Sequence, residues 1–164
     1  MSAISAPAAV VVPIPGAAAT AHALARAQAE DRGAVLYTSR GERRFASSAQ
    51  RLAFGERVSD FLVRVVQNLP TDIGFLISKG GITSNDVLSS GLALRASRVV
   101  GQILPGCSVV RCPEDHPRYP MLPVVIFPGN VGDEDALAEA YSALDLARTE
   151  HERMEKMKRI NPDL

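Results

Sequence analysis

A double glycine between a predicted strand and a predicted helix is the first stretch that could carry chemistry. Gly74 to Ser78 is an apolar run as long as a buried strand, Gly80 and Gly81 interrupt it, and Thr83 to Asp86 is a cluster of helix-capping residues. Glycine lets a ligand approach the main chain, and the N–H groups and dipole at a helix start favour an anion. The same residues also suit an ordinary strand-to-helix turn, so this stretch alone does not establish a site.

A second stretch, Pro128-Gly129-Asn130-Val131-Gly132, has the same layout. It follows the apolar run Leu122 to Phe127 and precedes a predicted helix that Asp133 would cap. Loops that leave the carboxyl ends of parallel strands gather at one edge of a sheet, where ligands bind. Two such loops of main-chain donors would suit a nucleotide polyphosphate. Neither matches the Walker A pattern or the dinucleotide pattern G-x-G-x-x-G.

The polar residues near these turns have plainer interpretations. Lys79 precedes the glycines, so we expect a solvated residue at a strand end. Asp133 fits a helix cap better than a Mg²⁺ ligand, and Asp86 is expected in the first turn of a helix. Solvated loop positions are expected for Arg40, Arg43 and Arg44. No catalytic residue is predicted.

Composition excludes several classes of protein. The 164 residues carry 18 basic and 18 acidic side chains and only 5% aromatics, which argues against nucleic-acid and anionic-membrane partners. Cys107, Cys112 and His116 have the wrong number and spacing for zinc, so no metal site is predicted. No apolar run approaches the ~20 residues of a membrane span, and the N-terminus lacks the basic region of a secretory signal. We therefore expect a cytoplasmic protein.

Apolar periodicity predicts strands that alternate with helices. The predicted strands are 8–12, 34–38, 74–78, 96–103, 108–111 and 122–127, and the predicted helices are 17–32, 49–68, 84–92 and 134–144. This order predicts an α/β fold, a layered and mostly parallel sheet with helices on its faces in three layers. The predicted organisation is a loose end at 1–7, an α/β domain at 8–145, and a charged helix and tail at 146–164.

Four motifs occur in order along this chain. They are Tyr37-Thr38-Ser39-Arg40, Ser78-Lys79-Gly80-Gly81-Ile82-Thr83-Ser84-Asn85-Asp86-Val87, Gly101-Gln102-Ile103-Leu104-Pro105-Gly106 and Phe127-Pro128-Gly129-Asn130-Val131-Gly132. Together they resemble the C-terminal nucleotide-binding domain of the four-carbon acid sugar kinase family, whose members phosphorylate acids such as threonate or erythronate derivatives. The resemblance implies ATP and Mg²⁺ as cofactors. It also implies nucleotide contacts from two groups of residues: Gly80, Gly81, Ile82 and Thr83, and Gly129, Asn130 and Gly132.

The resemblance leaves parts of the family's pattern unmatched. Neither the sugar-binding domain nor the Gly-Ser-rich strand and loop that opens the nucleotide domain is matched. We therefore expect ATP binding without kinase activity by this chain alone, with a separate sugar-binding domain or a second copy as partner. One alternative is a degenerate, non-catalytic remnant that acts through protein contacts. Another is a sensor of a phosphorylated ligand that uses the same loops.

Overall fold

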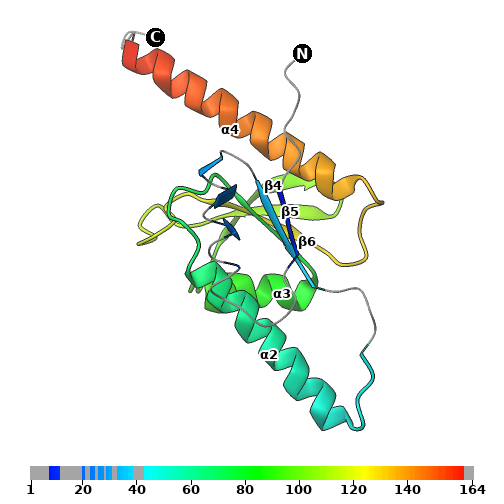
Figure 1. Ribbon diagram of the computed structural model, residues 1–164. Coiled ribbons are helices and arrows are strands. Elements are labelled where there is room, and N and C mark those ends of the chain that lie inside the picture. Colours follow the sequence, from blue (N-terminus) through cyan, green and yellow to red (C-terminus); the bar gives the residue numbers. More distant parts are fainter. Residues whose placement is uncertain are drawn as a thin grey trace. The chain divides into compact units, whose positions relative to one another are not determined.

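The structure is a computed structural model that describes residues 8–11, 20, 23–24, 26–27, 29–30, 33–38 and 43–160. Their helices and strands are shown in Figure 1. The chain divides into two compact units, one from Met1–Ile73 and Ile82–Arg95 and the other from Gly74–Gly81 and Ala96–Leu164. Several predictions lie outside the described residues: the loose end at 1–7, Ser39 and Arg40, and the last four residues of the tail. The predicted division into domains stays a prediction.

The first unit begins with a parallel pair of strands. Strand β1 (Ala8–Val11) pairs with β2 (Ala34–Tyr37), and Ala8 lies opposite Ala34. The described residues between 20 and 29 are helical, which agrees with the predicted helix between these strands. A parallel pair needs such a crossover, because a tight turn joins only antiparallel strands.

Helix α2 (Ser48–Gln67) has a clear start signal in the sequence. The Ser47 hydroxyl accepts a hydrogen bond from the Gln50 N–H at 3.2 Å, and the Gln50 side chain accepts one from the Ala46 N–H at 3.2 Å. The first bond satisfies an N–H group that the first helical turn leaves free, and the second satisfies the N–H just before the N-cap. Towards its other end α2 buries Val65 and Val66.

Helix α3 (Gly81–Asp86) begins earlier than predicted and continues into the π-helical turn η1 (Val87–Gly91). The expected first-turn position of Asp86 is wrong, because Asp86 is the last residue of α3. Its carboxylate accepts hydrogen bonds from the Ser59 hydroxyl of α2 and from the Asn85 side chain. Gly91 lies so close to α2 that an added Cβ would be 2.8 Å from Val66 Cγ1. The segment is therefore fixed against α2.

The second unit is built on a four-stranded sheet in the order β3-β6-β5-β4. Its strands are β3 (Leu76–Lys79), β4 (Arg98–Leu104), β5 (Cys107–Arg111) and β6 (Pro123–Phe127). Strand β3 runs parallel to β6, whereas β5 is antiparallel to both β6 and β4. The α/β class is confirmed, but the mostly parallel sheet is not. The physical reason is the short Pro105-Gly106 connection, where Gly106 has a φ of +81°, because so short a turn forces β4 and β5 to be antiparallel.

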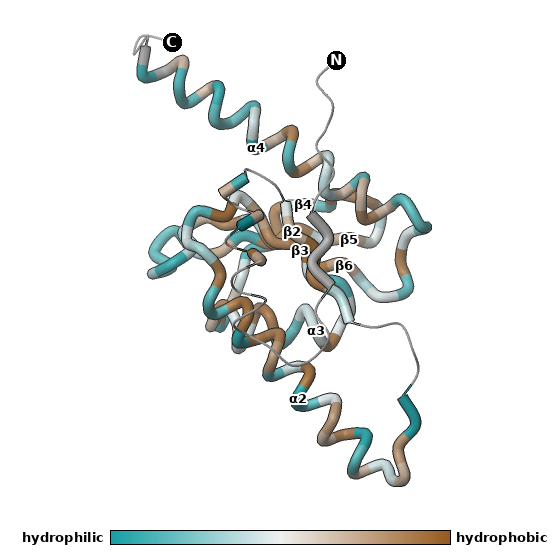
Figure 2. Tube along the Cα trace, in the orientation of Figure 1, coloured by the Kyte–Doolittle hydropathy of each residue, from teal (hydrophilic) through white to brown (hydrophobic). Residues whose placement is uncertain are grey.

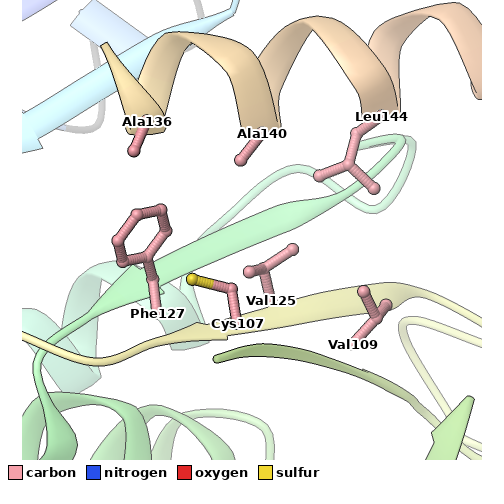
Figure 3. Close-up of a cluster of buried hydrophobic side chains, with 7 residues drawn as sticks. All are labelled: Cys107, Val109, Val125, Phe127, Ala136, Ala140 and Leu144. Atoms are coloured by element: carbon pink, nitrogen blue, oxygen red, sulfur yellow. The ribbon is translucent and has the colours of Figure 1, made fainter. Parts of the chain in front are cut away.

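Helix α4 (Ala136–Ile160) covers one face of this sheet with its first half. Figure 3 shows small and apolar side chains of the helix facing those of β5 and β6 across a closed core: Ala136, Ala140 and Leu144 above Cys107, Val109, Val125 and Phe127. The small alanines let the helix approach the sheet closely, and Phe127 fills the remaining space with 1% exposure. A second helical layer on this sheet, which the three-layer prediction requires, stays a prediction.

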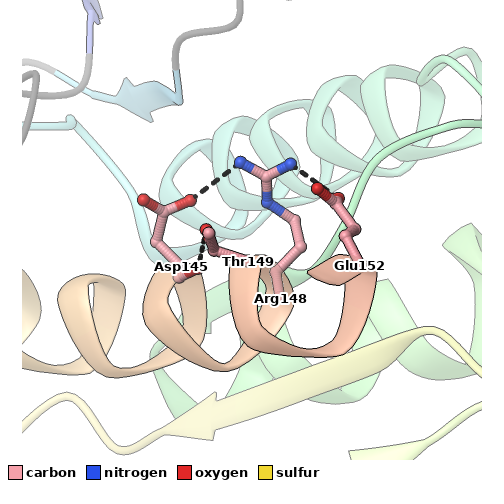
Figure 4. A network of polar contacts seen from close by, with 4 residues as sticks. All are labelled: Asp145, Arg148, Thr149 and Glu152. Atoms are coloured by element: carbon pink, nitrogen blue, oxygen red, sulfur yellow. Dashed lines mark hydrogen bonds and ion pairs between the residues drawn. The ribbon is translucent and has the colours of Figure 1, made fainter. Parts of the chain in front are cut away.

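The second half of α4 continues into the segment predicted as a charged helix and tail, and it is largely hydrophilic (Figure 2). Arg148 donates to Asp145 at 3.1 Å and to Glu152 at 2.9 Å, and the Thr149 hydroxyl donates to the Asp145 carbonyl at 2.9 Å (Figure 4). Burial acts to lower the pKa of Arg148, but the hydrogen bond to Asp145 and the two carboxylates raise it on balance. Among the described residues, no helix combines the length and apolarity needed to cross a bilayer.

Candidate functional site

The two glycine-rich turns lie side by side in the second unit. Because β3 and β6 are parallel neighbours, with Lys79 opposite Phe127, both strands end at the same edge of the sheet. The Gly80 N–H donates to the Phe127 carbonyl at 2.8 Å, and a Cβ added to Gly129 would lie 3.8 Å from Gly80 Cα. We call Gly80 and Gly81 the first glycine turn and residues 128–132 the second glycine turn. The predicted gathering of the two turns at one sheet edge is confirmed.

The Lys79 side chain forms hydrogen bonds with the main chain of the second glycine turn. Its ammonium donates to the Pro128 carbonyl at 3.2 Å and to the Val131 carbonyl at 3.3 Å. The same nitrogen lies 4.0 Å from the centre of the Phe127 ring, a cation–π distance. The expected role of Lys79 as a merely solvated residue is therefore incomplete. The sequence carried no signal for this contact, because it depends on the pairing of β3 with β6.

Two of the glycines are required by the conformation of the turns. Gly80 and Gly132 have φ values of +110° and +80°, a region that L side chains rarely adopt. At Gly132 an added Cβ would also lie 2.5 Å from Ala136 Cβ and 3.2 Å from Phe127 Cζ. Gly132 therefore serves the junction between β6 and α4, and its contribution to a ligand site is limited to its main chain.

Two other glycines have no such structural reason among the described residues. An added Cβ at Gly81 would meet nothing within 4 Å, and at Gly129 only the Gly80 Cα at 3.8 Å, an ordinary contact. Both residues are exposed, as is Asn130. Within the described part of the chain, no group accepts a hydrogen bond from the N–H of Gly81, Gly129 or Asn130. These positions thus offer bare main-chain donors to an outside acceptor.

Ile82 and Thr83, also predicted to contact nucleotide, lie on α3 in the other unit. Ile82 is 82% exposed and Thr83 is half-buried. With Gly81 they form the first turn of α3, whose N–H groups have no partner within the helix. Their contacts with nucleotide stay a prediction.

Asp133 is committed to the start of α4. Its Oδ1 accepts the N–H of Asp135 at 3.1 Å and that of Ala136 at 3.0 Å, so the predicted helix cap is confirmed. Among the described residues, no group of three or more His, Cys, Asp or Glu side chains could hold a metal ion.

The cysteines and His116 serve the fold. Cys107 and Cys112 are free and buried, and burial raises the pKa of the Cys112 thiol. His116 Nδ1 accepts the N–H of Arg118 at 3.3 Å and that of Tyr119 at 2.9 Å, which closes a turn. A titratable group held in this way is a structural element of the loop.

A separate hollow lies in the first unit, beside the start of α2. Arg43, Gln50, Glu56, Arg57 and Asp60 contribute to its lining. Arg43 is an exposed loop residue, as predicted, and its guanidinium lies 4.9 Å from the centre of the Phe54 ring. Mixed charge and an open shape distinguish this hollow from the paired glycine turns.

A comparison with protein families shows which family contains the two glycine turns. A family model described as the nucleotide-binding C-terminal domain matches residues 5–137, which include both turns. The chain belongs to this family. The resemblance to the C-terminal domain of the four-carbon acid sugar kinase family is thereby confirmed. No curated protein matches the chain.

A solved structure similar to this nucleotide-binding C-terminal domain shows the same fold, and a second match is to another crystal form of the same protein. One is a domain of unknown function (DUF1537) from Bordetella bronchiseptica, a domain-swapped dimer with bound citrate, with a TM-score of 0.56 and 19% identity. The similarity covers 84% of this chain and 35% of that chain. Another crystal form of that protein has a TM-score of 0.49 and 20% identity, covering 85% of this chain and 39% of that chain. The present chain thus spans about a third of the length of its structural relative.

Proposed function

We propose that this domain binds ATP with Mg²⁺ and that the polyphosphate lies on the two glycine turns. The observation that carries the proposal is that Gly81 and Gly129 have no side chain, although the fold has room for one at both positions. A Cβ there would occupy the space through which a phosphate oxygen reaches a main-chain N–H. Family membership supports a nucleotide as the source of that phosphate.

The exposed main-chain donors suit an anion such as phosphate. The exposed N–H groups of Gly81, Gly129 and Asn130 provide several main-chain dipoles and no charged side chain. Lys79 binds the carbonyls of Pro128 and Val131, so these oxygens are already engaged and repel an approaching anion less. Mg²⁺ would accompany the phosphates and offset their charge.

We further propose that the domain is the nucleotide half of an acid sugar kinase of the threonate or erythronate type. Phosphoryl transfer requires the acceptor hydroxyl in line with the terminal phosphate, with water excluded. The similarity covers 84% of this chain but only 35% of the structural relative, so the acceptor would be bound by another domain or chain. By itself the chain would bind nucleotide without transferring its phosphate.

Titration calorimetry with ATP, ADP and Mg²⁺ tests the binding. Gly81→Val and Gly129→Ala should each weaken ATP binding about tenfold or more, a change of about 1.4 kcal/mol. Gly101→Val is the matched control, because an added Cβ at Gly101 also meets nothing within 4 Å but lies on edge strand β4. ADP should compete with ATP, since both would use the same turns.

The outcomes separate the parts of the proposal. A folded wild-type chain that gives no binding signal with either nucleotide would refute nucleotide binding. Equal losses in Gly101→Val and Gly81→Val would place the effect in the fold instead of the turns. Consumption of ATP by the chain alone with threonate or erythronate would refute the half-enzyme proposal while leaving the nucleotide site intact.

A further inference from the structure

The outer half of α4, residues 145–160, carries an exposed stripe that the nucleotide site does not use. Leu146 is 62% exposed, Met154 56% and Met157 48%, although these are large apolar side chains. Leu146 lies about 160° around the helix from the buried Leu144, at about 100° per residue. Leu146 therefore points away from the face that packs on the sheet.

A row of exposed residues on α4 that includes Leu146 and Met157, but not Met154, has coiled-coil spacing. Ala143, Leu146, Glu150, Arg153 and Met157 follow one another at steps of three, four, three and four residues. Steps that alternate between three and four keep side chains on one seam, which a second helix can cover. We call these five residues the outer seam. All five are exposed.

The outer seam is complementary to itself when two copies run antiparallel. A two-fold axis midway between residues 151 and 152 places Leu146 opposite Met157 of the second copy, and Glu150 opposite Arg153. The two apolar layers, each of Leu146 and Met157, would then flank two central ion pairs between Glu150 and Arg153. A parallel pair would instead place Glu150 against Glu150 and Arg153 against Arg153, which like-charge repulsion disfavours.

The two charged residues of the outer seam can pair with a second copy. Within the residues that the structure describes, neither Glu150 nor Arg153 has an ion-pair partner, whereas Arg148 on another face of α4 contacts Asp145 and Glu152. A charge pair at the centre of a seam costs stability but fixes register and orientation. The position of Glu150 and Arg153 between apolar residues fits that role.

We propose that a second copy of this chain pairs with the first along the outer seam, antiparallel and with two-fold symmetry. The seam from Leu146 to Met157 is short, about 17 Å at 1.5 Å per residue, so the dimer is weak. The pairing is independent of nucleotide, because the seam lies on α4 and contains none of the residues of the glycine turns.

Sedimentation equilibrium of the full chain tests the pairing up to about 1 mM, the weak end of measurable affinity. Arg153→Glu should weaken the dimer about tenfold or more, because Glu150 would then face a second carboxylate. The double variant Glu150→Arg with Arg153→Glu should restore it to within about threefold, since the exchanged charges remain complementary. Arg159→Glu, the same change on another face of α4, is the matched control.

Cross-linking tests the register. Oxidation of L146C/M157C should give a covalent dimer, because residues 146 and 157 of the two copies lie in the same layer. The variant L146C alone should cross-link far less, since its symmetry mate lies several turns away in this register. The native thiols, Cys107 and Cys112, are buried and should not interfere.

Each outcome decides the proposal. A wild-type chain that stays monomeric up to about 1 mM would overturn it, and the seam would then face another protein or a further domain. A dimer that is unchanged by Arg153→Glu would also overturn it and would indicate another interface, such as an exchanged segment. Failure of the charge exchange to restore the dimer, with helical content unchanged, would show that Glu150 and Arg153 do not face each other.

Discussion

The two halves of α4 differ in what surrounds them. The inner half, residues 136–144, buries Ala136, Ala140 and Leu144 against the sheet. The outer half continues the same helix with charged residues and exposed apolar ones, among them Leu146 and Met157. Helix propensity and side-chain ion pairs support the outer half, whereas packing supports the inner half.

This difference shows that a continuous helix can contain segments stabilised by unrelated forces. Tertiary packing supplies most helical stability in globular proteins, so the inner half should resist local opening and the outer half should fray first. Apolar residues within a frayable, charged segment need another explanation, and a second helix along the outer seam supplies it. Substitutions in the two halves can test the contrast directly.

The largest effect is expected at the inner half. Leu144→Ala should destabilise the chain by about 2–4 kcal/mol, because it leaves a cavity between α4 and the sheet. Because Leu144 is only 7% exposed, almost all of its side chain is buried, and the substitution removes that buried apolar surface. Urea unfolding followed by circular dichroism measures the change, and a loss below about 1 kcal/mol would contradict the packing of this half.

A smaller effect is expected at the start of the inner half. Asp133→Ala removes the carboxylate that accepts the N–H groups of Asp135 and Ala136, at a cost of about 1 kcal/mol. Asp133→Asn should retain most of this stability, because its amide oxygen can accept the same bonds. If both variants lose stability equally, charge at the helix start matters more than the hydrogen bonds.

The junction with the outer half should show an intermediate result. The Arg148 side chain lies against Gly74, while its guanidinium binds Asp145 and Glu152. Arg148→Met keeps an apolar stem on Gly74 and should cost about 0.5 kcal/mol, whereas Arg148→Ala loses the stem as well and should cost about 1 kcal/mol. Thermal unfolding in low and high salt separates the two terms, because only the ion pairs should weaken with salt.

The smallest effect is expected on the outer seam. Leu146→Ala, the same change as Leu144→Ala two residues further on, should alter the stability of a dilute sample by less than about 0.5 kcal/mol. The reason is that Leu146 is 62% exposed in a single copy. A loss comparable with that of Leu144→Ala at low concentration would show that the outer half also packs within one chain.

The sequence predicted the elements better than their pairing. The strand before the second glycine turn and the helix start at Asp133 follow from local chemistry, an apolar run and a capping carboxylate. The antiparallel pairing of β4 and β5 was also readable, since only Pro105 and Gly106 separate them. The early start of α3 at Gly81 was not, because the capping residues Thr83 and Ser84 pointed to a later one.

The sequence located the two turns of the candidate site, because both contain glycines. A glycine can be needed for the backbone conformation of a turn, or it can leave space for a ligand to approach the main chain. The sequence does not distinguish these cases, but the structure does: the fold requires Gly132 and does not require Gly129. The role of Lys79 could not be predicted, since its partners Pro128 and Val131 lie on a loop that β3 meets only through the sheet. Contacts between distant segments carry no local pattern.

The exposed methionines of α4 give the helix a chemical sensitivity that its inner half lacks. Mild peroxide should convert Met154 and Met157 to sulfoxides before it reaches the enclosed thiols of Cys107 and Cys112, because the thioethers are open to solvent. A sulfoxide at Met157 is polar and would weaken its contact with Leu146 of a second copy, while leaving the sheet beneath α4 undisturbed. The end of this helix would therefore respond to oxidants while the core does not.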